Sequence, residues 1–199
     1  AEAQAQLVAS IRDLMPLRNK SLNDLEAMLI KNPHPTLRNL AVEVNKNGVK
    51  QIIITSSRAK LKSMDTAKAL ACYMQLDGIK IAIINFSERS KKLDIREEWS
   101  SVGSFIAETG GHTSILWPDG DLLPIDLLSR RDFLKNLQSL HSTYDLIFLC
   151  ADDVDAISLL RALEGQKIFH IMVARIKHTK SRALANMRSL IPIQGLLHD

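Results

Sequence analysis

The stretch Q-I-I-I-T-S-S-R-A-K-L-K-S-M, residues 51–64, decides the fold class of this chain. An apolar run typical of a buried strand leads into a short polar loop that ends in Lys62-Ser63. The residues that follow, D-T-A-K-A-L-A-C-Y-M at 65–74, have the pattern of an amphipathic helix. A strand, a loop with Lys-Ser and a helix are the parts of a phosphate-binding loop, yet this loop contains no glycine.

The rest of the chain repeats the alternation of strand and helix. Strands are predicted at 50–55, 79–86, 113–117, 145–150, 167–174 and 193–198. Helices are predicted at 3–15, from 21, from 36, and at 63–77, 95–108, 125–141, 153–164 and 179–190. Apolar strands joined by helices favour an α/β fold of three layers, with a mostly parallel sheet flanked by helices. We expect residues 1–35 to form an N-terminal helical extension or linker and residues 36–199 to form the α/β domain.

Ligands of such sheets bind at the carboxyl ends of the strands. The prediction therefore brings three segments to one edge of the sheet: the loop after 50–55, Asn85-Phe86-Ser87 and Cys150-Ala151-Asp152.

The composition limits the classes of function. No apolar stretch approaches the roughly 20 residues that a membrane-spanning helix needs. The formal net charge of +4 is spread along the chain and aromatic residues are not interleaved with it, so we expect no nucleic-acid partner. The six histidines lack the spacing of metal ligands, so we expect no metal site. Cys72 and Cys150 are predicted to be buried free thiols, as in a reducing compartment.

Several blocks of sequence, in a fixed order, carry a resemblance to a known family. They are L-R-N-L at 37–40, I-T-S-S-R-A-K-L-K-S at 54–63, L-D-G-I-K-I-A-I-I-N-F-S at 76–87, P-I-D-L-L-S at 124–129, Y-D-L-I-F-L-C at 144–150, V-A-R-I-K-H-T at 173–179 and G-L-L-H-D at 195–199. In this order and spacing the chain resembles the cytoplasmic kinase-like domains of bacterial tyrosine kinases and exopolysaccharide co-polymerases, which belong to the deviant P-loop ATPases. The resemblance covers residues 37–199 and implies a P-loop NTPase-like fold.

The resemblance places a phosphate loop at four residues, Arg58, Lys60, Lys62 and Ser63. The glycines of that loop are replaced, because Ser56 stands for the first glycine, Leu61 for the second, and Ala59 lies between them. Glycines let backbone N–H groups close around phosphates. Leu61 therefore either projects into the phosphate space or forces the backbone open. We expect a vestigial loop that keeps some attraction for anions at a helix N-terminus.

The resemblance also implies two acidic motifs that serve Mg²⁺, one after strand 79–86 and one at the end of strand 145–150. Their positions hold Asn85, Ser87 and Cys150, none of which is a carboxylate. A thiol is a poor ligand for a hard cation. Asp152 and Asp153 follow closely and are the candidate substitutes. Loss of these carboxylates and of the glycines predicts that ATP hydrolysis and tyrosine phosphorylation are absent.

Two hypotheses follow. The first is a pseudo-enzyme: a catalytically degenerate domain of an exopolysaccharide biosynthesis and transport protein, which regulates chain length and needs no cofactor. The alternative is a divergent ATPase or protein-tyrosine kinase of the same pathway that holds ATP through Lys62 and Mg²⁺ through Asp152 or Asp153. The blocks P-I-D-L-L-S and Tyr144-Asp145 disfavour a third relative, the partitioning ATPases.

The first hypothesis also implies partners and a location. The domain would contact itself or proteins of polysaccharide synthesis and export, at the cytoplasmic face of the bacterial inner membrane. Membrane attachment would come from a segment outside these 199 residues, as would the tyrosine cluster that such kinases phosphorylate. Of the family's E-x-x-R-x-x-R assembly motif, whose positions here are Asn32, Pro35 and Arg38, only Arg38 remains, and we expect it to be an oligomer contact.

Overall fold

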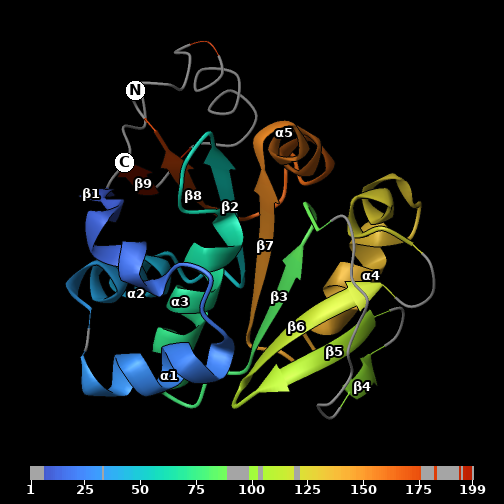
Figure 1. Cartoon of the computed structure of the whole chain (residues 1–199). Coiled ribbons are helices and arrows are strands. Elements are labelled where there is room, and N and C mark those ends of the chain that lie inside the picture. The colour runs from blue at the N-terminus through green and yellow to red at the C-terminus, as the bar shows by residue number, and fades with distance from the viewer. Residues whose placement is uncertain are drawn as a thin grey trace.

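The computed structural model describes residues 7–32, 34–88, 99–102, 105–118, 122–175, 182, 193 and 195–198. Its strands are β1 (Leu7–Ser10), β2 (Gln51–Ser57), β3 (Ile81–Asn85), β4 (Trp99–Val102), β5 (Phe105–Gly110), β6 (Thr113–Pro118), β7 (Leu146–Asp152), β8 (Phe169–Ala174) and β9 (Gly195–His198). They form a single sheet in the order β1-β9-β8-β2-β7-β3-β6-β5-β4 (Figure 1). The first seven strands of this order, β1 through β6, pair in parallel. The last two strands, β5 and β4, pair antiparallel.

The helical elements are η1 (Ile11–Leu17), α1 (Leu22–Lys31), α2 (Pro35–Asn47), α3 (Ser63–Gln75), η2 (Pro124–Ser129), α4 (Phe133–Leu140) and α5 (Asp153–Ala162). Local chemistry sets their ends. The Ser21 hydroxyl accepts a hydrogen bond from the Asp24 amide at 3.1 Å and so caps the start of α1. Gly48 ends α2 in a left-handed conformation with φ of 60°, which glycine adopts without steric cost.

Two hydrophobic clusters cover the two faces of the sheet. Because side chains alternate along a strand, Ile52 and Ile54 of β2 join one cluster while Ile53 joins the other. The first cluster contains the buried residues of α1, α2 and α3, and the second contains those of η2, α4 and α5. The molecule therefore has three layers, helices–sheet–helices, and the predicted α/β fold with a mostly parallel sheet is confirmed (Figure 1).

Six predicted strands are present, with boundaries that shift by at most two residues. The predicted helix at 95–108 is wrong, because this segment contributes β4 and β5. Its Ser-Ser-Val-Gly-Ser stretch at 100–104 favours helix weakly, and pairing with β6 gives the backbone an alternative set of hydrogen bonds. The predicted helix at 179–190 lies outside the described residues, apart from Arg182.

The N-terminal segment also departs from the prediction. The helix expected at 3–15 is wrong, since residues 7–10 form β1, which pairs in parallel with β9, and a 3₁₀ helix follows. Leu14, Leu25 and Leu29 are buried in the same cluster as α2 and α3. The boundary at residue 36 stays a prediction about domain organisation, while the described residues on both sides of it share one core. No helix in the described ranges is long and apolar enough to cross a membrane.

The packing of α1 predicts a contrast between two of its residues. Leu25 is fully buried and Ile30 is 61% exposed on the same helix. Leu25→Ala should lower the free energy of unfolding by about 2–5 kcal/mol, because it removes a buried side chain and leaves a cavity. Ile30→Ala should change it by no more than about 0.5 kcal/mol. Urea unfolding measures both values, and similar values for the two variants would show that α1 is not part of the core.

Candidate functional site

Three strand ends meet at one edge of the sheet. In the central pairing, β7 lies between β2 and β3, with Ser56 opposite Asp152 and Asn85 opposite Cys150. The carboxyl ends of the three strands therefore bring their following segments together, as predicted for parallel strands. This edge, with the loop 58–62 and the start of α3, is the candidate site.

The loop between β2 and α3 alternates between solvent and core. Arg58, Lys60 and Lys62 are exposed, whereas Ala59 and Leu61 are buried, Leu61 with an exposed fraction of only 1%. Leu61 belongs to the cluster that contains α1, α2 and α3. Its side chain therefore packs in the core. Of the two possibilities that the sequence left open, projection of Leu61 into the phosphate space is excluded.

Asp152 connects the end of β7 to the start of α3. Its Oδ1 atom accepts a hydrogen bond from the Ser63 amide at 3.0 Å and a short one from the Ser56 hydroxyl. Its own amide donates to the Ser87 Oγ atom at 2.7 Å. Asp152 is half-buried, so these bonds are partly shielded from water. The carboxylate thus lies against the first amide of α3, where an anion is favoured by the helix dipole.

Asp153 makes a second link to the same loop. Its Oδ1 atom accepts a hydrogen bond from the Arg58 amide at 2.9 Å. Both residues have a φ of +51°, a left-handed conformation that costs a non-glycine residue about 1–2 kcal/mol. The strain expected for a glycine-poor loop therefore falls on Arg58, and not on Ala59 or Leu61.

A third carboxylate, Asp65, was not predicted. Its two oxygens accept from the Asn19 amide at 2.9 Å and from the Lys62 amide at 3.1 Å. It stands at the third position of α3, where an acidic residue commonly reaches back to the residue before the helix. That spacing, Lys62-Ser63-Met64-Asp65, was the signal in the sequence that would have identified it.

The positions at which the resemblance implies Mg²⁺ ligands are occupied by neutral groups. The Asn85 Oδ1 atom accepts from the Ser87 amide at 3.1 Å, which closes a local turn. Cys150 is fully buried, and its carbonyl accepts from the Phe86 amide at 2.8 Å. Burial, and then the nearby Asp152 charge, raise the pKa of the Cys150 thiol well above its ordinary value of 9.0. The sulfur therefore stays protonated and is no ligand for a hard cation.

Lys62 and Ser63, the two residues that match a phosphate loop, differ in their surroundings. Lys62 is exposed, and in the described part of the chain its ammonium group has no ion-pair partner. Ser63 is fully buried, and its hydroxyl has no hydrogen-bond partner among the described residues. Within the same ranges, no group of three or more His, Cys, Asp or Glu side chains is placed to hold a metal ion. Asp152 and Asp153, the candidate substitutes for a cation, both already accept amide hydrogen bonds.

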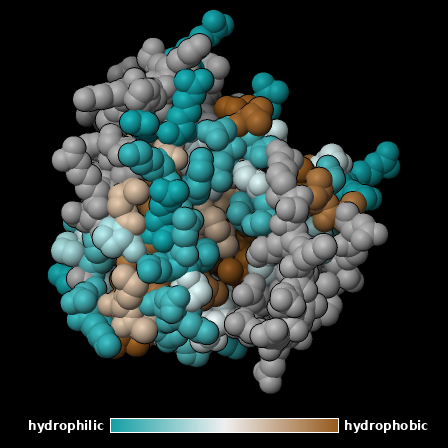
Figure 2. Space-filling view, viewed as in Figure 1, coloured by the Kyte–Doolittle hydropathy of each residue, from teal (hydrophilic) through white to brown (hydrophobic). Residues whose placement is uncertain are grey.

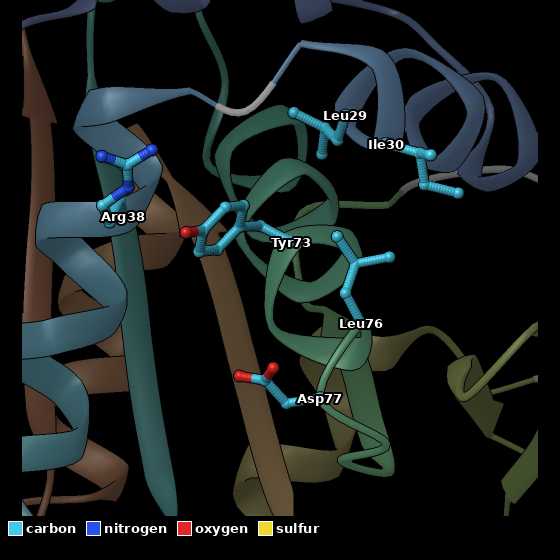
Figure 3. Close-up of a pocket in the computed structure, with 6 residues that line it drawn as sticks. All are labelled: Leu29, Ile30, Arg38, Tyr73, Leu76 and Asp77. Atoms are coloured by element: carbon cyan, nitrogen blue, oxygen red, sulfur yellow. The ribbon is translucent and has the colours of Figure 1, made fainter.

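Arg38 lies away from this edge, beside a pocket of about 420 Å³ between α1, α2 and the end of α3. The pocket is lined by Leu29, Ile30, Arg38, Tyr73, Leu76 and Asp77 (Figure 3). Ten residues of α3 separate Ser63 from Tyr73, which corresponds to roughly 15 Å along the helix axis. Arg38 therefore does not contribute to the candidate site.

The buried thiol predicts a pH dependence of stability. An unfolded chain releases the Cys150 proton near pH 9.0, whereas the folded chain keeps it well above that pH. In this interval the folded state binds more protons, so the free energy of unfolding falls as pH rises, by up to about 1.4 kcal/mol per pH unit for each thiol. Cys150→Ala should therefore lose less stability above pH 9 than the natural chain in urea unfolding.

Cys72→Ala is the positive control for that measurement. Burial and the Glu26 charge raise the pKa of Cys72 to about 12, so this variant should flatten the same pH profile. If Cys150→Ala and the natural chain lose stability equally between pH 9 and 11, the Cys150 thiol is not protonated by burial.

Comparison with known proteins adds a finding about the fold. No protein-family model and no curated protein matches the sequence. Among solved structures, the BceF tyrosine kinase domain is 17% identical, with 99% of this chain and 93% of that domain covered at a TM-score of 0.66. The VpsO kinase domain is 17% identical, with 89% and 95% covered at 0.58. The kinase domain of the Escherichia coli tyrosine kinase ETK is 15% identical, with 98% and 89% covered at 0.65. The chain therefore has the fold of bacterial tyrosine kinase domains.

Proposed function

We propose that this chain is a non-catalytic, tyrosine-kinase-like domain of an exopolysaccharide biosynthesis and transport protein, and that it acts through protein contacts. The proposal rests on one observation: the positions where Mg²⁺ carboxylates are expected hold the neutral side chains of Asn85, Ser87 and Cys150. The Cys150 thiol is also fully buried. The pathway is inferred from the fold shared with bacterial tyrosine kinase domains and from the sequence blocks at 124–129 and 144–150.

Phosphoryl transfer depends on positioning and on charge stabilisation by Mg²⁺ and lysine. Lys62 stands at the position expected for the phosphate-binding lysine, and the backbone amides of Ser63 and Arg58 are bonded to Asp152 and Asp153. Two carboxylates at the loop repel a triphosphate. A domain with these surroundings keeps the tyrosine-kinase fold without the groups that perform the chemistry.

The contacts of the domain are proposed to involve the Arg38 pocket. Its lining combines exposed apolar side chains, Ile30 at 61% and Leu76 at 45%, with the charges of Arg38 and Asp77 (Figure 3). Among the residues coloured in Figure 2, the visible face is mainly hydrophilic with separate apolar patches. We infer contacts with a second copy or with synthesis and export proteins, at the cytoplasmic face of the inner membrane.

One observation favours the alternative, a divergent ATPase or kinase. Ser63 retains a buried hydroxyl without a partner among the described residues, and Lys62 beside it is exposed. In a working phosphate loop these two groups contact Mg²⁺ and the phosphates. The alternative requires Asp152 or Asp153 to leave its amide partner and bind Mg²⁺.

Nucleotide measurements separate the two functions. Phosphate release from Mg-ATP should stay at background for the natural chain, for Lys62→Ala and for the control Lys60→Ala, because neutral side chains occupy the positions expected for Mg²⁺ carboxylates. Isothermal titration should detect no binding of Mg-ATP. Micromolar binding that disappears in Lys62→Ala and persists in Lys60→Ala would establish the alternative.

Self-association tests the proposed contact surface. Sedimentation velocity of the natural chain should show oligomers that increase with concentration, and Arg38→Glu should shift the population to monomer by reversing the charge at the pocket. Arg161→Glu, an exposed position on α5 at the opposite face, should have no effect. If both variants associate like the natural chain, Arg38 is not an oligomer contact.

A further inference from the structure

The loop between β2 and α3 is bonded to carboxylates of its own chain. Asp152 accepts hydrogen bonds from the Ser63 amide and the Ser56 hydroxyl, and Asp153 accepts one from the Arg58 amide. We propose that these two carboxylates are internal anions, which take the places of phosphate oxygens and hold the loop closed without a ligand. The proposal goes beyond the proposed function, because it concerns which groups accept hydrogen bonds from the amides of this loop and not what the domain contacts.

The orientation of Asp152 is the first reason. Asp152 is the N-cap residue of α5, where an aspartate ordinarily accepts a hydrogen bond from its own helix. Its side chain makes no such bond in α5. The carboxylate instead reaches the amide of Ser63, which begins α3 and lies 89 positions earlier in the chain. Asp152, at the start of α5, therefore caps the N-terminus of α3.

Backbone conformation is the second reason. Among the described residues, only Asn19, Arg58 and Asp153 are non-glycine residues with left-handed φ values. Two of the three, Arg58 and Asp153, are joined by one carboxylate–amide bond at this loop, because the Arg58 amide donates to Asp153. Such conformations persist only where surrounding interactions hold them. Their grouping indicates that the carboxylate bonds fix the loop.

Charge is the third reason. Arg58, Lys60 and Lys62 surround a helix N-terminus, a setting that favours an anion. The Asp152 carboxylate supplies that anion at the Ser63 amide. A phosphate that approached this amide would meet like charge and would have to displace the carboxylate. Asp65 is a local cap of α3 and is not part of the proposal.

Thermal unfolding with inorganic phosphate as the probe tests the proposal on the whole 199-residue chain. Melting temperatures are compared in sodium phosphate and in sodium chloride of equal ionic strength. Asp152→Ala should melt below the natural chain, and phosphate should raise its melting temperature by about 2–4 °C more than it raises that of the natural chain. Phosphate would then occupy the vacated position at the Ser63 amide.

Further variants make the test decisive. Asp126→Ala removes an exposed carboxylate from the first turn of η2 and should respond to phosphate like the natural chain. Asp152→Asn keeps an acceptor oxygen, so it should fold even if Asp152→Ala does not, and should also gain stability from phosphate because the charge is gone. Asp153→Ala should speed hydrogen exchange of the Arg58 amide, with phosphate restoring protection.

Two results would overturn the internal-anion proposal. One is a phosphate response of Asp152→Ala and Asp152→Asn that equals that of Asp126→Ala. The other is a natural chain that phosphate stabilises as much as it stabilises the Asp152 variants. Either result leaves the proposed lack of catalysis untouched, because that is measured by phosphate release from Mg-ATP.

Discussion

The first amides of a helix have no partner within the helix, and at α3 this constraint organises one edge of the sheet. Here the acceptors are side-chain carboxylates: Asp65 for the Lys62 amide and Asp152 for the Ser63 amide. Asp152 can reach Ser63 only because β2 and β7 are neighbours in register, with Ser56 opposite Asp152. The central pairing of the sheet and the state of the loop are therefore coupled.

Patterns of local sequence were enough to predict the centre of the fold. The apolar runs that form β2, β3, β7 and β8 are buried on both faces, and such runs indicate parallel strands covered by helices. The failures lie where pairing between distant segments decides. Residues 7–10 become a strand because β9 lies beside them, and residues 99–102 and 105–110 become strands through the antiparallel extension from β6. Local periodicity predicts the partner strands at 113–117 and 193–198, but it does not show which segments pair with them.

The sequence predicted which residues gather at the candidate site, but not the hydrogen bonds between them. Strand order brings Lys62, Ser63, Asn85, Cys150 and Asp152 to one edge, as the sequence predicted. From the sequence, Asp152 and Asp153 were candidate substitutes for Mg²⁺ ligands. In the structure, their carboxylates accept hydrogen bonds from backbone amides. Spacing along the chain gives the neighbourhood of a side chain, but its rotamer and partner depend on the packed structure.

Burial among the central strands explains why a thiol is stable at Cys150, near the end of β7. Cys150 is fully buried and its side chain lies in the cluster that contains α3. A carboxylate there would lose its hydration, and the half-buried charge of Asp152 close by would add repulsion. A metal ion would offset that cost, and without one a neutral thiol that packs as a small apolar group is the more stable choice. A neutral side chain at Cys150 also places no like charge beside the Asp152 carboxylate, which accepts the Ser63 amide at the start of α3.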